Sequence, residues 1–206
     1  MAQPRYQRRK EDRPDEIAAA AMEAFAEHGY AGTKVADVAK RAGVSKGLMY
    51  LYFKTKEELF KAVIRSVVIP RVAALEALME SSGLSSEAWL CGPFTEFAKS
   101  LPGSHIAVIV RLMIAEGPKH PDLVAFYWDN VVSRGLRAMS NLIERGIESG
   151  EFQRSRLTEQ PHLIIMPVVF SVIFRLIFAD KSLDTDQLID TQTDLLIRGL
   201  KDPADA

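Results

Sequence analysis

A cluster of polar side chains in the first third of the sequence is suited to binding a charged ligand. The hydrogen-bond donors belong to Ser45, Lys46, Tyr50 and Tyr52. Gly47 lies among them and lets the backbone approach a phosphate closely. Ser45 is placed to cap a helix N-terminus, where backbone N–H groups attract anions. The sequence shows no nucleophilic side chain paired with a recognisable general base. These side chains therefore indicate contacts to phosphates and nucleobases rather than catalysis.

Two short helices joined by a tight turn must position these donors. Val35, Val38, Ala39 and Ala42 recur at helical spacing, and Thr33 is placed to cap that first helix. Gly43-Val44-Ser45 then forms the turn, with Val44 expected to be buried between the two helices. The second helix is predicted to run from Ser45 to about Phe53. A turn this short holds the second helix away from the body, where it can enter a major groove.

Longer helices flank this pair. Pro14 suits the first position of a helix whose apolar face includes Ile17 and Phe25 and which ends at Gly29. A further helix starts after Thr55, and Pro70 is expected to kink or divide it.

The remaining sequence reads as helices separated by breakers, so the predicted fold class is all-α. The breakers are 81–86, 102–103, 117–121, 150–161 and 179–185. The last two helices are expected at about Pro161 to Ala179 and Thr185 to Leu200. The first of these is apolar almost all round but too short to span a membrane, which predicts a protein without a membrane anchor.

Charge is divided unevenly along the chain. Residues 1–65 carry 13 Lys and Arg against 9 Asp and Glu, or +4, whereas the remaining residues carry 13 against 18, or −5. A basic head on an acidic body is expected where only the head meets phosphates. A single cysteine, Cys91, excludes an intramolecular disulfide and favours a cytoplasmic location. The basic residues of 1–12 are not followed by a signal-peptide core and predict a flexible arm.

Two stretches of the head resemble the DNA-binding head of the tetracycline-repressor (TetR) family: Phe25-Ala26-Glu27-His28-Gly29-Tyr30 with Thr33, and the run from Ala42 to Leu59. The resemblance covers about the first third of the chain. It implies a helix-turn-helix DNA-binding domain at 1–55 and a helical ligand-binding and dimerisation domain at 56–206. It also implies a homodimer formed through about residues 161–200. The DNA contacts that it implies are Thr33, Lys34, Ser45, Lys46, Gly47, Leu48, Tyr50, Tyr52 and Lys56.

Two positions on the recognition helix depart from the family pattern. Many relatives carry threonine, alanine or asparagine where this chain has Leu48, and a tyrosine or histidine where it has Leu51. Leucine can touch a thymine methyl group but cannot make a bidentate hydrogen bond to a base. The alternative for Tyr50, Tyr52 and Phe53 is a role as core aromatics, and we favour a core role for Phe53 and for Met49.

The body is richer in aromatic and methionine side chains than the head, which suits either an apolar ligand pocket or an ordinary core. The pocket candidates are Trp89, Phe94, Phe97, Arg111, Met113, Phe126, Trp128, Met166, Phe170 and Phe174. Arg111, Glu116 and Arg175 interrupt apolar runs and either meet a partner or face solvent. The scattered histidines predict no metal site, and no cofactor is expected.

The resulting prediction is a transcriptional repressor that a small lipophilic or aromatic ligand releases from a pseudo-palindromic double-stranded DNA operator. A regulator whose ligand promotes DNA binding, or that answers to no ligand, is the alternative within this class. A helical carrier or enzyme without a DNA-binding role is the rival from another class, which the absence of a catalytic motif disfavours.

Overall fold

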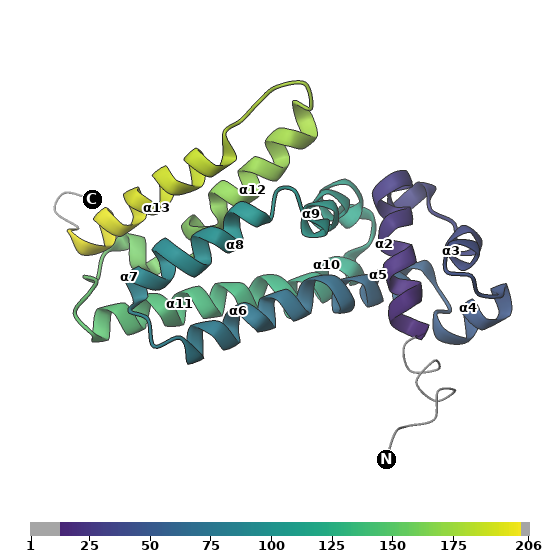
Figure 1. Cartoon of the computed structure of the whole chain (residues 1–206), viewed down its shortest axis with the longest axis horizontal. Coiled ribbons are helices and arrows are strands. Elements are labelled where there is room, and N and C mark those ends of the chain that lie inside the picture. Colours follow the sequence, from purple (N-terminus) through teal and green to yellow (C-terminus); the bar gives the residue numbers. More distant parts are fainter. Residues whose placement is uncertain (1–12, 203–206) are drawn as a thin grey trace, which may run out of the picture. The chain divides into compact units, whose positions relative to one another are not determined.

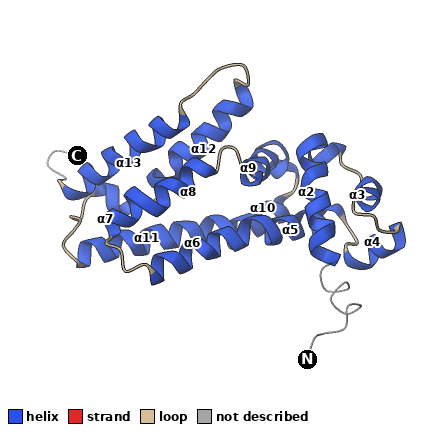
Figure 2. Ribbon diagram, in the orientation of Figure 1, coloured by secondary structure: helices blue, strands red, loops and turns tan. Residues whose placement is uncertain are grey.

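The structure is a computed structural model that describes residues 13–202. The predicted basic arm at 1–12 lies outside this range. Every regular element of the described range is helical (Figure 2). The chain divides into two compact units, which are described separately. One comprises the chain up to Pro70 together with Leu112–Tyr127, and the other comprises Arg71–Arg111 together with the chain from Trp128 onward. The functional boundary at residue 55 remains a prediction, because compactness alone does not locate it.

Four helices form the N-terminal part of the first unit: α2 (Arg13–Gly32), α3 (Val35–Arg41), α4 (Lys46–Tyr52) and α5 (Lys56–Val63) (Figure 1). Gly29 interrupts α2 with a φ of 69°, so the regular helix ends where the sequence predicts. The core between α2 and α5 is aromatic, with the ring centroids of Phe25 and Phe60 5.3 Å apart. Met49 and Phe53 are buried, which confirms the core role predicted for both.

Serine and threonine caps fix the start of two of these helices. Ser45 Oγ accepts a hydrogen bond from the Leu48 N–H at 3.1 Å, and Thr55 Oγ1 accepts one from the Glu58 N–H at 3.1 Å. The predicted Thr33 cap is wrong, because the residue at the N-cap of α3 is Lys34 and its side chain makes no capping bond.

Of the two outcomes predicted at Pro70, a kink or a division of the helix, the structure shows no division. The chain continues from α5 through a π-helical segment, Ile64–Val68, into α6 (Ile69–Ser81). The proline ring lacks an N–H, and the wider turn just before it accommodates the missing hydrogen bond.

The first unit is completed by the 3₁₀ turn Gly117–Lys119 and by α10 (Pro121–Tyr127), which packs against α5. The His120 ring meets the Tyr30 ring edge-on at 4.8 Å, and its Nδ1 lies 3.8 Å from Glu57 Oε1. The cationic groups of Lys61 and Arg65 lie 5.6 and 4.8 Å from the centroid of the Phe126 ring. These contacts attach α10 to the helices of the head.

The second unit is a set of helices whose connections lie where the sequence places its breakers. In chain order it contains most of α6, α7 (Ser86–Trp89), π-helical Leu90–Phe94, α8 (Thr95–Ser100), the first part of α9 (His105–Glu116), π-helical Trp128–Val132, α11 (Ser133–Glu148), the 3₁₀ turn Arg156–Glu159, α12 (His162–Ile177) and α13 (Thr185–Lys201). Helix α13 packs on α12 and α8. Thr95 and Thr193 bring their hydroxyl oxygens within 3.3 Å, and Lys99 pairs with Asp190 at 2.6 Å.

No single helix within residues 13–202 is long and apolar enough to cross a membrane. Only together do the segments Ser86–Ser100 and His105–Lys119 have sufficient length and apolar composition, and they are bent by 68° relative to each other. The same residues contain no group of three or more His, Cys, Asp or Glu side chains arranged to hold a metal ion.

Candidate nucleic-acid interface

Helix α4 has one buried side and one exposed side. Met49 is fully buried, whereas Lys46, Gly47, Tyr50 and Leu51 are exposed. At 100° per residue, these four positions fall on one continuous face of the helix, with Gly47 between Tyr50 and Leu51. We call these four residues the α4 outer face. It combines a cation, a gap in the side-chain layer, a phenol and an apolar side chain.

The turn before α4 holds this face outward. Gly43 adopts a φ of 64°, which L-residues with a side chain rarely adopt, and the Val44 N–H donates to the Ala39 carbonyl at 3.0 Å. Val44 itself is only half-buried, less than predicted. The turn therefore fixes the angle between α3 and α4 mainly through backbone conformation.

An ion pair between Arg41 and Glu27 connects α3 to α2 and so helps to fix the position of the helix that precedes the turn. Arg41 Nη1 donates to Glu27 Oε1 at 2.8 Å, and Nη2 reaches Oε2 of the same carboxylate at 2.5 Å. The side-chain hydrogen bond from Arg41 lowers the pKa of Glu27. A two-point contact of this kind orients both side chains as well as attracting them.

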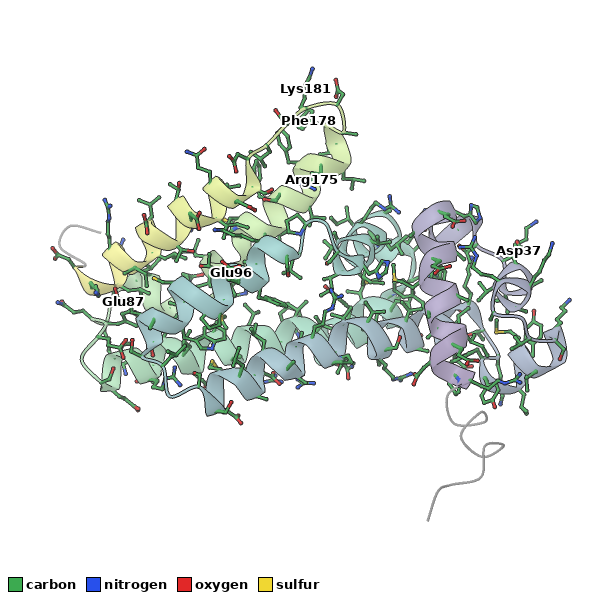
Figure 3. The ribbon with its side chains drawn as sticks, in the orientation of Figure 1. Asp37, Glu87, Glu96, Arg175, Phe178 and Lys181 are labelled. Atoms are coloured by element: carbon green, nitrogen blue, oxygen red, sulfur yellow. The ribbon has the colours of Figure 1, made fainter. Side chains whose placement is uncertain are left out.

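Lysines surround the α4 outer face. The exposed lysines of α3, α4 and the loops beside them are Lys34, Lys40, Lys46 and Lys54. Asp37 on α3 (Figure 3) and Glu58 on α5 are the exposed acids of this region. Glu58 Oε2 accepts a hydrogen bond from the Lys54 backbone N–H at 2.7 Å. The surrounding charge suits a polyanion.

The structure exposes five of the nine predicted DNA contacts: Lys34, Ser45, Lys46, Gly47 and Tyr50. Leu48, Tyr52 and Lys56 are half-buried. Thr33 is 2% exposed, and its hydroxyl lies 2.7 Å from the Gly29 carbonyl and 3.1 Å from the Ala24 carbonyl. The geometry therefore gives the Thr33 side chain a role inside the head, where it satisfies carbonyls at the end of α2.

Lys56 is also occupied internally. Its Nζ lies 2.8 Å from the Tyr30 carbonyl oxygen, 3.3 Å from that of Thr33 and 3.4 Å from that of Ala31. It also sits 4.5 Å from the centroid of the Tyr30 ring. Three carbonyls match the three N–H donors of an ammonium group. This geometry favours a role in fixing the end of α2 over the phosphate contact expected from the sequence.

The set of predicted DNA contacts does not include Leu51, although the sequence indicates that this leucine can touch a thymine methyl group and its side chain is 74% exposed on the α4 outer face. The signal for it is present in the sequence. Leu51 lies four residues after Gly47, and residues four apart share a helix face. The predicted set contains Leu48 instead, and the structure partly covers that side chain.

The ten predicted pocket residues are divided between the two compact units. Met113 and Phe126 belong to the first unit and the other eight to the second. Trp89 and Phe94 are buried and stacked with centroids 5.8 Å apart. The exposure of the other pocket candidates in the second unit differs. Three are partly buried, namely Phe97, Arg111 and Phe174. Three are exposed over about half of their surface, namely Trp128, Met166 and Phe170. The indole Nε1 of Trp89 is buried without a hydrogen-bond partner in the described part of the chain.

An apolar surface lies on α12 and α13. Its large exposed side chains are Met166, Val169, Phe170, Leu176, Ile177, Phe178 and Leu195. Of the interrupting charges, Arg175 is exposed near the end of α12, where its Nη2 lies 3.4 Å from Thr185 Oγ1 (Figure 3). Glu116 pairs with Lys119 at 3.1 Å. An apolar surface of several large side chains marks a contact site in a folded protein.

Comparison with known proteins adds a family and several relatives. The family model for bacterial regulatory proteins of the tetR family matches residues 17–63. The fatty acid metabolism regulator protein of Bacillus subtilis is 25% identical over 195 residues, which cover 93% of this chain and 98% of the relative. The transcriptional repressor KstR2 of Mycolicibacterium smegmatis is 25% identical over 142 residues, 68% of each chain. The structure of the fatty acid degradation regulator FadR from Bacillus halodurans superposes with a TM-score of 0.74 at 26% identity, covering 92% of this chain and 96% of that one.

Proposed function

This chain belongs to the tetR family of bacterial transcriptional regulators, and from that premise we propose that it represses genes by binding a pseudo-palindromic operator as a homodimer. Regulators of this family bind DNA operators and small-molecule effectors and form dimers. The observation that carries the proposal is the α4 outer face, with its exposed Lys46, Tyr50 and Leu51 beside further exposed lysines. A short helix held outward in this way suits a major groove.

The apolar surface on α12 and α13 supports the dimer. Phe170 and Leu195 are 49% and 59% exposed, and burying such side chains against a second copy stabilises the pair by about 25 cal/mol for each Å² removed from water. A two-fold interface of this kind gives the dimer two symmetry-related heads. Their two copies of α4 can then bind two half-sites related by the same symmetry.

The effector of this proposal is a lipophilic molecule with an acyl chain. Two relatives that align along almost the whole chain are named as regulators of fatty acid metabolism or degradation, which favours an acyl chain over an aromatic compound. Trp89 supports a polar anchor for such a molecule, because a buried N–H without a partner calls for an acceptor. Effector binding would favour a conformation of lower operator affinity and thereby release DNA.

The test of the DNA-binding proposal is selection of duplexes from a random pool by the full-length protein, followed by titration at several salt concentrations. We expect recovery of an inverted repeat and an affinity that falls steeply as salt rises. Recovery of no preferred duplex would refute the proposal.

The effector is tested by adding palmitate, palmitoyl-coenzyme A or, as an aromatic control, benzoate to the selected complex. We expect one of the acyl probes to weaken operator binding and benzoate to have no effect. Trp89→Phe removes the N–H while retaining an aromatic ring, so it should reduce sensitivity to the acyl probe without changing operator affinity in its absence. Tighter operator binding with the acyl probe, or no response to either, would contradict release by an acyl effector.

A further inference from the structure

Leu51 is an apolar side chain in a place where the fold gives it nothing to pack against. It is 74% exposed, the largest exposed fraction among the large apolar side chains within residues 13–202. Met49 on the opposite side of the same helix is completely buried, so α4 already contributes its core residue. Leu51 is therefore available for a contact outside the chain.

The neighbouring positions allow a partner to approach Leu51 closely. Gly47 lies one turn earlier on the same face, and a Cβ placed on it would have no heavy atom within 4 Å. The space beside Leu51 is thus open along the helix rather than covered by a side chain. Tyr50, 43% exposed, flanks the opening on its other side.

Charge identifies the class of partner. Lys46 on this face and Lys54 beyond the helix end are exposed. Apolar contact inside a cationic surround matches a duplex groove, where phosphates line the edges and base pairs form the floor. The apolar group on the floor of the major groove is the C5-methyl of thymine, whereas the other base edges offer hydrogen-bonding atoms.

We propose that Leu51 determines operator sequence by packing on the C5-methyl group of a thymine in each half-site. This inference rests on the proposed function and extends it from binding DNA to the base that is read. Leu51 cannot satisfy the donor or acceptor of another base edge, so it favours thymine by contact and disfavours bases whose polar atoms it would cover.

The experiment removes a single methyl group from the DNA. Each thymine of the selected operator is replaced in turn by deoxyuridine, which keeps the base pair and its hydrogen bonds. Loss of the methyl contacted by Leu51 should weaken wild-type binding about fourfold in one half-site and about fifteenfold in both, as expected for one buried methylene-sized group per site. Leu51→Ala should bind the thymine and deoxyuridine operators within about twofold of each other.

The matched control is Leu78→Ala, since Leu78 is a 45% exposed leucine on α6, outside α4. It should retain the full methyl dependence of the wild type. If no deoxyuridine substitution weakens wild-type binding, or if Leu51→Ala retains the methyl dependence, Leu51 does not read thymine. Specific, salt-sensitive binding would persist in that case and the proposed function would stand. Absence of any preferred duplex would overturn both.

Discussion

At position 47, folding and DNA binding favour different residues. It lies inside α4, where glycine is less favourable than alanine by about 1 kcal/mol, and a Cβ there would meet no atom of the chain within 4 Å. The fold therefore gives no reason for glycine at this position. We predict that Gly47→Ala raises thermal stability by a few degrees. It should weaken operator binding about tenfold or more, because in the proposed complex the added methyl group would lie where the DNA backbone approaches.

Gly135 provides the matched control for this substitution. It lies in α11, and a Cβ on it would likewise meet nothing within 4 Å. Gly135→Ala should raise the melting temperature in calorimetry and leave operator affinity unchanged. Unaltered affinity in Gly47→Ala would show that the DNA does not approach this turn of α4.

Lys46 and Lys56 carry the same charge but are expected to behave differently. Lys46 is exposed on the α4 outer face, so Lys46→Ala should weaken binding to all duplexes and reduce the slope of log affinity against log salt by about 0.9 for each head. Lys56 is held by three carbonyl oxygens of the segment that ends α2. Lys56→Met should instead leave the salt slope unchanged and lower the free energy of unfolding by about 1–3 kcal/mol. A reduced slope with unchanged stability in Lys56→Met would restore its role as a phosphate contact.

Glu151 fastens α7 to the segment that follows α11. Its carboxylate oxygens accept the backbone N–H groups of Ser86 and Glu87 at 3.2 and 2.9 Å and the Ser149 hydroxyl at 2.9 Å. Burial would raise the pKa of Glu151, but these hydrogen bonds outweigh it and lower the pKa overall. A carboxylate with a lowered pKa stabilises the fold at a pH above its unfolded value of about 4.3, and this contribution disappears as the pH falls through the folded pKa.

We therefore predict that Glu151→Gln lowers the free energy of unfolding by about 1 kcal/mol at pH 7 and that its difference from wild type diminishes below about pH 4. Urea denaturation at a series of pH values measures this. Glu148→Gln, an exposed position on α11, is the control and should cost little at any pH. A Glu151→Gln difference that is constant across the pH range would show that ionisation of the carboxylate is not responsible.

The helices were largely predictable because their signals are local. Ser45 and Thr55 accept capping bonds as their positions suggest, and Gly29 and Gly43 adopt the positive φ values that end their helices. The capping role predicted for Thr33 is wrong because its hydroxyl has two possible uses. It can cap the next helix or donate a hydrogen bond to the Ala24 or Gly29 carbonyl, and only the packing of α2 decides between them. The π-helical segment before Pro70 was likewise not predictable, because the local sequence does not show how tertiary packing holds a continuous helix on both sides of the proline.

The candidate site was predictable only in part, because exposure depends on tertiary packing. Lys46 and Tyr50 lie outward as their residue types suggest, whereas Lys56 is drawn inward by carbonyls 23 to 26 residues away. Among the apolar side chains, the composition that suggests a pocket equally suits a core or an interface. Trp89 and Phe170 illustrate this, since one is fully buried and the other is 49% exposed.

In the proposed homodimer, operator recognition by the whole molecule depends on two heads acting together. A single α4 contacts few base pairs, and joining two heads raises affinity because the second head binds at high effective concentration. The surface on α12 and α13 must therefore remain apolar if it joins the subunits. A charge placed in such an interface stays unpaired when it is desolvated, which is strongly unfavourable.

Phe170→Glu on α12 should consequently convert the dimer to a monomer, as measured by sedimentation, while each subunit remains helical. Leu78→Glu on α6 provides the control, because it introduces the same charge at a similarly exposed position outside α12 and α13. We expect the Phe170→Glu monomer to bind the selected inverted repeat at least a hundredfold more weakly, with an affinity close to that for a single half-site, since the second head no longer adds to the first. A dimer that survives Phe170→Glu would mean that another surface joins the subunits. A monomer that retains full operator affinity would mean that one copy of α4 suffices, and the inverted repeat would then have no physical basis in the symmetry of the protein.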